Sequence, residues 1–119
     1  MEIRSRAAAT PFTTADGSTI RSLLDRTNAP VAKHSLAEAT LEPGQATRRH
    51  YHRESEEIYY LIEGEGEMEI DGERRRVAAG DAVLIPPGAR HSIRNVAAEP
   101  LRLLCSCAPP YRHEDTYFD

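Results

Sequence analysis

Short apolar runs alternate with turn-forming residues along most of the chain. Runs with the composition of β-strands cover residues 58–62, 82–85 and 101–107, and no segment has the apolar spacing of a long amphipathic helix. The turn signals between the runs are Asp16-Gly17, Glu42-Pro43-Gly44, Glu63-Gly64, Asp71-Gly72, Gly80-Asp81 and Pro86-Pro87-Gly88. Short strands separated by closely spaced turns are typical of β-sandwiches and β-barrels. We therefore expect an all-β fold.

The turn at Asp71-Gly72 predicts a hairpin with a defined register. A two-residue Asp-Gly loop favours the type I′ turn, which fixes the pairing of the two strands beside it. This register places Glu69 opposite Arg74 and Glu67 opposite Arg76. Each such cross-strand ion pair contributes about 0.2–1 kcal/mol. We therefore interpret the run of three arginines as the outer face of a hairpin rather than as a nucleic-acid patch.

Composition limits the classes of partner. The formal charge is −4, and no apolar run approaches the roughly 18 residues of a membrane span. Neither feature favours nucleic acid or an anionic membrane as a partner. Residues 1–14 lack the apolar centre of a secretory signal. We expect a cytoplasmic protein with a small-molecule ligand or substrate.

The 119 residues predict one domain with two polar ends. Residues 1–17 are small and polar, and we expect a flexible N-terminal segment or one that lies across a partner subunit. Residues 18–108 would form a single barrel domain. Residues 109–119 begin with two prolines and contain many charges. We therefore expect them to form a polar C-terminal tail that leaves the sheet.

His50 and His52 are the first signs of chemistry in the sequence. Residues i and i+2 of a strand face the same side, roughly 7 Å apart, so two imidazoles there can bind one ion. Glu57 follows, and His91 comes after a Pro-Gly turn. Such a mixed nitrogen and oxygen set suits zinc, iron, copper or nickel, and also manganese. The neighbouring Glu56 is the alternative carboxylate ligand.

The spacing around these residues forms two motifs. The first contains, in order, Gly44, His50, His52, Glu57 and Gly64, and the second Gly80, Pro86, Gly88, His91 and Asn95. All ten positions resemble the two signature motifs of the cupin superfamily. The resemblance spans residues 44–95 and implies a small single-domain cupin, a double-stranded β-helix of the jelly-roll barrel type. It further implies that His50, His52, Glu57 and His91 bind one divalent metal ion, which could be Fe, Mn, Zn, Ni, Cu or Co.

Strand alternation nominates two further residues for the catalytic site. If His50 and His52 point inward, Arg48 does too, and if Glu57 points inward, Tyr59 follows. Arg48 could hold a carboxylate or phosphate of a substrate by a two-pronged contact, or lie solvated at the rim. Tyr59 could donate a proton or a hydrogen bond, or serve only in packing.

Four other reactive residues have open roles. Cys105 and Cys107 share one face of a strand, either as buried core thiols or with one of them in the metal cavity. His34 is expected at the surface, and His113 lies in the polar tail. Either histidine could reach over the cavity mouth as an acid or a base.

The run at residues 58–62 is apolar on both faces, as expected where a second sheet or another subunit covers the outside. The resemblance to small cupins, which are commonly dimeric, implies a homodimer, and we expect one here. The function predicted is a metal-dependent enzyme that acts on a small polar or anionic metabolite. Dioxygenase-like chemistry is favoured over isomerase-like or lyase-like chemistry. The alternative is a non-catalytic, metal-dependent module that binds or senses a small molecule, because fold alone does not determine function.

Overall fold

A computed structural model describes residues 1–119. The chain forms eleven strands and two short 3-10 turns, which confirms the all-β prediction. In order, the elements are η1 (Arg6–Ala8), β1 (Phe12–Thr13), β2 (Thr19–Leu24), β3 (Ser35–Leu41), β4 (Tyr51–His52), β5 (Glu56–Glu63), β6 (Glu65–Ile70), β7 (Glu73–Ala78), β8 (Ala82–Ile85), β9 (His91–Asn95), β10 (Leu101–Ala108), η2 (His113–Asp115) and β11 (Thr116–Tyr117). No helix is long and apolar enough to cross a membrane.

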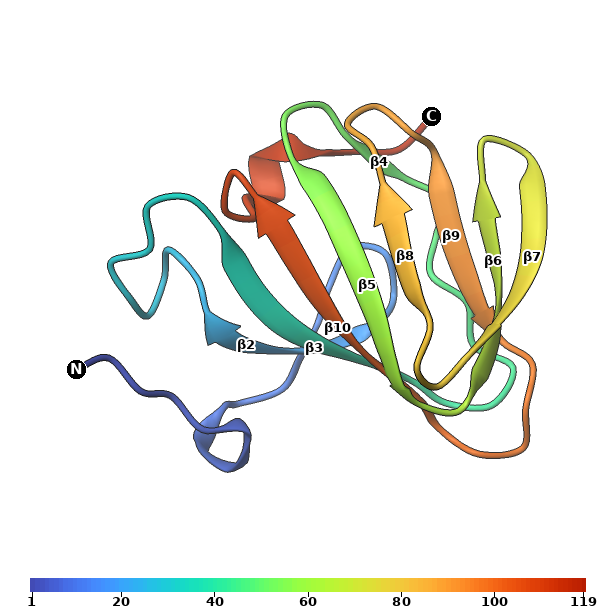
Figure 1. The fold of residues 1–119 in the computed structure, drawn as a ribbon, viewed down its shortest axis with the longest axis horizontal. Helices are drawn as coiled ribbons and strands as arrows, with labels where there is room; N and C mark the ends of the chain where they lie inside the picture. Colours follow the sequence, from blue (N-terminus) through green and yellow to red (C-terminus); the bar gives the residue numbers. More distant parts are fainter.

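The strands form two layers that curl around a common interior (Figure 1). One layer is a six-stranded sheet in the order β1-β2-β3-β10-β5-β8. The other contains the three-stranded sheet β7-β6-β9 and the pair β11-β4. A bridge joins His50, the residue just before β4, to His91, the first residue of β9, so these two smaller sheets lie side by side. This arrangement brings the two histidine segments together, although forty residues separate them in the sequence.

The interior has an apolar end and an open end. Along β5, Glu57, Tyr59 and Leu61 are buried, whereas Ile58 and Tyr60 are exposed. This alternation confirms the parity expected for a regular strand. The buried cluster at the apolar end contains Ala39, Leu41, Tyr59, Leu61, Met68, Ile85, Ala89, Ile93, Leu101 and Leu103.

The hairpin between β6 and β7 has the predicted register. Glu69 lies opposite Arg74, and Glu67 lies opposite Arg76. Asp71 and Gly72 have φ angles of 49° and 92°. Two consecutive positive φ angles are the requirement of a type I′ turn, which Gly meets without strain.

The ion pairs on this hairpin differ from the prediction. Arg74 Nη1 lies 3.3 Å from Glu67 Oε1, which is the diagonal rather than the directly opposite carboxylate. Glu69 instead accepts hydrogen bonds from Arg49 Nε and the backbone N–H of Gly72, both at 2.8 Å. The directly opposite pair does not form because Glu69 already has these two donors.

The C-terminal tail leaves the six-stranded sheet after Ala108 and then returns to pair β11 with β4. Asp115 is buried in η2, and its carboxylate accepts hydrogen bonds from the backbone N–H groups of Arg53, Glu54 and Ser55 at 3.0–3.2 Å. The tail therefore fixes the loop between β4 and β5. The N-terminal segment contains β1, which pairs with β2. The domain boundaries at residues 17–18 and 108–109 stay a prediction.

The outer face of β5 and β8 is apolar and uncovered. Ile58, Tyr60 and Leu84 are 44%, 47% and 56% exposed, and Ile58 lies directly opposite Leu84. The sequence predicts either a second sheet or another subunit over this face. No second sheet of the chain covers it.

Candidate metal centre

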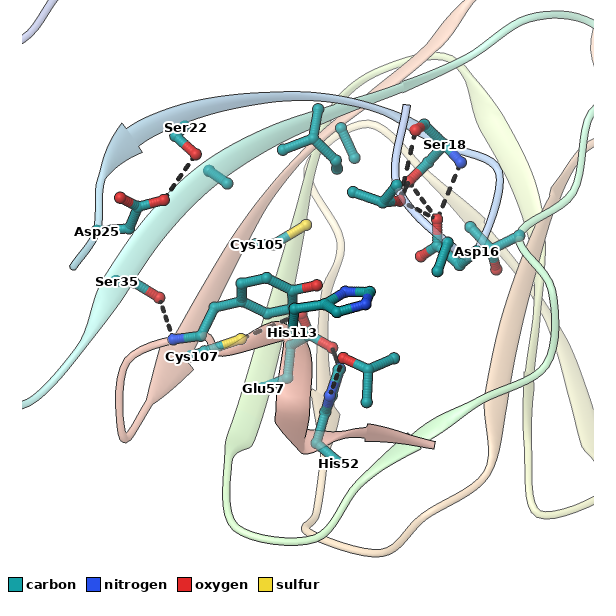
Figure 2. Close-up of a pocket in the computed structure, with 18 of the residues that line it drawn as sticks. Asp16, Ser18, Ser22, Asp25, Ser35, His52, Glu57, Cys105, Cys107 and His113 are labelled. Atoms are coloured by element: carbon teal, nitrogen blue, oxygen red, sulfur yellow. Dashed lines mark hydrogen bonds and ion pairs between the residues drawn. The ribbon is translucent and has the colours of Figure 1, made fainter. Parts of the chain in front are cut away.

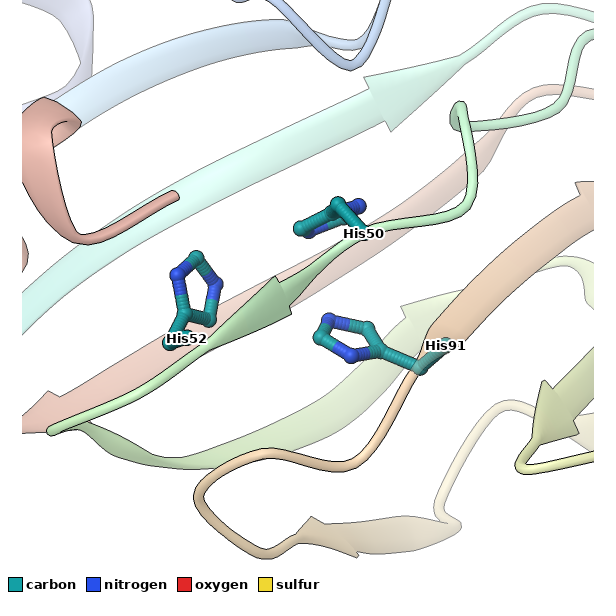
Figure 3. A group of neighbouring side chains, drawn as sticks. All are labelled: His50, His52 and His91. Carbon is teal, nitrogen blue, oxygen red and sulfur yellow. The ribbon is translucent and has the colours of Figure 1, made fainter. Parts of the chain in front are cut away.

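His50, His52 and His91 converge in the interior, as Figure 3 shows. His50 and His52 come from the segment that ends in β4, and His91 is the first residue of β9. All three are at least 96% buried, and one nitrogen from each lies within 4.8 Å of the other two. Three ligand atoms at this separation could bind a metal ion.

Backbone carbonyls select the tautomer of each imidazole. Every Nδ1 lies within hydrogen-bond distance of a carbonyl oxygen, which can only accept, so each Nδ1 carries the proton. Each Nε2 therefore presents a free lone pair to the cluster, as metal-binding histidines require. The three acceptors are the carbonyls of Arg48, Asp115 and Ala89, at 2.7 Å from His50 Nδ1, 3.1 Å from His52 Nδ1 and 2.9 Å from His91 Nδ1 respectively.

Glu57 faces two of these nitrogens from β5. Its Oε1 lies 3.4 Å from His52 Nε2 and 3.4 Å from His91 Nε2. Both Glu57 Oε1 and His91 Nε2 are buried without a hydrogen-bond partner. A buried polar atom without a partner is costly, and a bound cation would satisfy both at once. The donor set therefore fits a divalent ion, and Glu56, the alternative carboxylate, is exposed.

Burial and mutual contacts shift the pKa values in this cluster. Burial, together with the neighbouring His91, lowers the pKa of His50. Burial alone would also lower the pKa of His52, but the adjoining Glu57 carboxylate outweighs it and raises that pKa. Burial would raise the pKa of Glu57, yet the imidazoles of His52 and His91 hold it well below its usual range. Glu57 is therefore ionised at neutral pH.

The two cysteines of β10 line the cavity beside this cluster, and Cys107 is buried while Cys105 packs against the core, so both of the roles considered for them apply. Cys107 lies directly opposite Glu57 in the sheet, and its Sγ donates a hydrogen bond to Glu57 Oε2 at 3.3 Å. Burial and the nearby Glu57 charge raise the pKa of both thiols, so they stay protonated. The Cys107 contact leaves Oε1 of Glu57 facing the imidazoles.

A cavity of about 660 Å³ opens beside the metal centre, and Figure 2 shows part of its lining. Its wall contains the apolar residues Ile20, Ala37, Ala39, Ile93 and Leu103. Tyr59 also lines the cavity, as predicted, and is 4% exposed. Burial and the Glu57 charge raise the pKa of Tyr59 well above its ordinary value. Its hydroxyl is therefore a donor at neutral pH.

Arg48 does not point into the cavity, so the alternation argument was wrong for this residue. Its side chain is exposed, and its guanidinium carbon lies 4.1 Å from the ring centre of Phe118. The chain just before His50 is not a regular strand, so the two-residue period does not apply there. Arg48 contributes through its backbone, since its carbonyl accepts the hydrogen bond from His50.

Asp16 is a site residue that the sequence did not indicate. Its Oδ1 accepts hydrogen bonds from Thr14 Oγ1 at 2.5 Å and from Ser18 N and Oγ at 2.9 and 2.7 Å. Its Oδ2 lies 3.8 Å from His50 Nε2. The Asp-Gly pair indicated only a turn, and no spacing connects residue 16 with the histidine motif.

The two remaining histidines lie in different places. His113 lines the mouth of the cavity on η2, where Figure 2 labels it, and its side chain is exposed. His34 is exposed just before β3 and does not line the cavity. Of the two, only His113 is near enough to contact a ligand in the mouth.

Residues 37–107 match the family model of the cupin domain. The chain belongs to the cupin family. This cupin is 48% identical over 106 residues to an uncharacterized protein of Methanocaldococcus jannaschii, covering 89% of this chain and 85% of that protein. It is 33% identical over 93 residues to the polyketide synthase CurC of Streptomyces cyaneus, covering 78% of this chain and 60% of that protein.

Among solved structures, one described as a predicted oxalate decarboxylase from Thermotoga maritima has a TM-score of 0.78 and 27% identity, covering 91% of this chain and 98% of that chain. The description of CurC refers to polyketides and that of the Thermotoga maritima protein to oxalate, and these are very different molecules. The family therefore establishes the barrel and leaves the substrate to the residues around the cavity.

Proposed function

We propose that this cupin is a metal-dependent enzyme that acts on a small organic molecule, with one divalent ion held by His50, His52, Glu57 and His91. The proposal depends chiefly on the three Nε2 lone pairs that converge beside a cavity. A bound divalent ion supplies a Lewis acid that polarises an oxygen of the substrate. The donor set is compatible with Fe, Mn, Zn, Ni, Cu or Co.

Two residues of the chain supply a hydrogen-bond donor and a carboxylate acceptor beside the centre. Tyr59 lines the cavity with a protonated hydroxyl, and Asp16 presents Oδ2 next to His50. The Asp16 carboxylate suits a general base, while the Tyr59 hydroxyl, which keeps its proton, suits a hydrogen bond to a substrate oxygen. This favours an isomerase-like or lyase-like reaction over the oxygen-dependent reaction expected from the sequence.

The test begins with the metal content of protein purified without an affinity tag, followed by product analysis with a panel of small metabolites. We expect about one divalent ion per chain and turnover of at least one panel member. His50→Ala should lose the metal, whereas His34→Ala, which removes an exposed histidine outside the cavity, should retain it. Full metal occupancy in His50→Ala would contradict the site. Binding of metabolites without any product would instead favour a binding or sensing module.

We also propose that a second copy of the chain covers the outer face of β5 and β8. Support comes from the adjacent exposed side chains of Ile58, Tyr60 and Leu84, which lie at one edge of the six-stranded sheet. Light scattering over a concentration series should give a dimer for the wild type and a monomer for Ile58→Glu. Val96→Glu, at an exposed apolar residue after β9, is the control and should remain dimeric. A wild type that is monomeric at every concentration contradicts this proposal.

A further inference from the structure

The cavity beside the metal centre has carboxylates inside and cations only at its mouth. Asp16, Asp25 and Glu57 line it, and all three are largely shielded from solvent. The arginines that line it, Arg26 and Arg112, are both exposed. Arg112 Nη2 moreover lies 2.7 Å from Glu54 Oε2, so its charge already has a partner. No guanidinium or ammonium group therefore meets a ligand inside the cavity.

The charge around the metal centre is also balanced. A divalent ion held by neutral imidazoles and Glu57 has a net charge of +1, and the Asp16 carboxylate beside His50 reduces the local sum to zero. An anionic ligand entering this space would lose hydration and meet no net positive charge in return. The electrostatics therefore disfavour small anionic acids as ligands.

The size and lining of the cavity point in the same direction. Its volume of about 660 Å³ lies in the range of pockets that enclose drug-sized ligands. A molecule the size of oxalate would leave the apolar wall formed by Ile20, Ala37, Ala39 and Leu103 without contacts. An apolar ring system would bury this wall and gain the free energy of removing it from water.

Asp16 adds one specific hydrogen-bonding feature. Its Oδ1 already accepts three hydrogen bonds, whereas no protein donor contacts Oδ2. A ligand hydroxyl near the metal centre would donate to this free oxygen, and a ligand carboxylate would be repelled by it.

We propose that the cavity binds an uncharged, hydroxylated, ring-bearing molecule rather than a small anionic acid. This inference rests on the proposed function, because it specifies the substrate class of the same site. Of the small polar or anionic metabolite expected from the sequence, it keeps the polar alternative and drops the anionic one, for which Arg48 was the cation considered.

The test compares three probes by titration calorimetry on the full chain loaded with zinc. 1-Naphthol and 1-naphthoate have nearly the same shape and differ in charge, and oxalate represents the small acids. We expect the Kd of 1-naphthol to be lower than those of 1-naphthoate and oxalate by roughly tenfold or more, because only the anions lack a partner inside. The same order is expected with zinc-free protein, so this test does not depend on metal binding.

Asp16→Asn separates the charge argument from simple shape. The amide keeps an oxygen for the bonds from Thr14 and Ser18 but removes the negative charge, so the preference for 1-naphthol over 1-naphthoate should shrink severalfold. Glu73→Gln, which removes an exposed acid of β7 outside the cavity, is the matched control and should leave the preference unchanged. Melting temperatures of both variants check that they fold.

Tighter binding of 1-naphthoate or oxalate, or no binding of 1-naphthol, would overturn the proposal. An unchanged preference in Asp16→Asn would overturn the role given to Asp16. Failure of the wild type to bind zinc is a separate result, measured by metal analysis. It would contradict the metal centre given under the proposed function. The titrations of zinc-free protein would then still test which class of ligand the cavity binds.

Discussion

The two ends of the cavity are built differently. At the metal end, backbone carbonyls hold all three imidazoles, the Cys107 thiol holds Glu57, and every one of these side chains is buried. At the mouth, Arg26, Arg112 and His113 are exposed, and Arg112 pairs with another surface residue.

This difference predicts how variants at the two ends affect metal binding. Ligands that are fixed by the backbone and by buried hydrogen bonds are preorganised, so little conformational entropy is lost when an ion binds. Exposed side chains at the mouth can change without disturbing the ligands behind them. Variants at the metal end should therefore change metal affinity strongly, and variants at the mouth should leave it nearly constant.

The largest effect is expected for His91→Ala. Loss of one of three imidazoles removes a direct ligand. Zinc affinity should therefore fall by more than the roughly 10–100-fold that is typical when a residue hydrogen-bonded to a ligand is changed. Competition titration with a chromophoric chelator measures this. Affinity within tenfold of the wild type would show that His91 is not a ligand.

The second-largest effect is expected for Asp115→Ala, and it should appear in the free energy of unfolding, because Asp115 connects the C-terminal tail to the loop beside the metal end. Three backbone N–H groups, one of them buried and two partly buried, would lose their acceptor, at a cost of about 2 kcal/mol in the free energy of unfolding. Urea denaturation measures the loss. Asp119→Ala, which breaks an exposed contact with Arg90 in the same tail, should cost less than about 1 kcal/mol. Equal losses in the two variants would contradict a special role for Asp115.

Cys107→Val should have an intermediate effect on metal affinity. It removes the hydrogen bond that orients Glu57, and we expect zinc affinity to fall about tenfold. Cys107→Ser keeps a donor and should recover most of the affinity. Cys105→Val is the matched control, because Cys105 lines the same cavity from the same strand and makes no hydrogen bond to Glu57. A loss in the control as large as in Cys107→Val would indicate packing instead.

Arg112→Ala should have the smallest effect. Its ion pair with Glu54 is exposed, so zinc affinity should stay within about twofold of the wild type. The chelator titration used for His91→Ala measures it. A change above tenfold would mean that the mouth and the metal end are coupled, and the contrast between them would no longer hold.

Local patterns predicted the fold class, and the motif positions predicted the histidine cluster. The register of the β6–β7 hairpin follows from the φ angles that an Asp-Gly turn requires, and the burial of Glu57 and Tyr59 follows from the two-residue period of β5. The convergence of His91 with His50 and His52 was expected from the resemblance to the cupin motifs, and the bridge between His50 and His91 produces it.

The sequence by itself therefore determined the strands and the hairpin, because these depend on neighbours a few residues apart, and its ten motif positions indicated the side chains able to bind a metal. Only the tertiary structure decided that Asp16 lies beside His50, that Asp115 anchors the β4–β5 loop and that Arg48 stays outside. The positions of Asp16 and Asp115 depend on how distant segments pack, and that of Arg48 depends on an irregular stretch of backbone. Local periodicity in the sequence predicts neither the packing nor the irregular backbone.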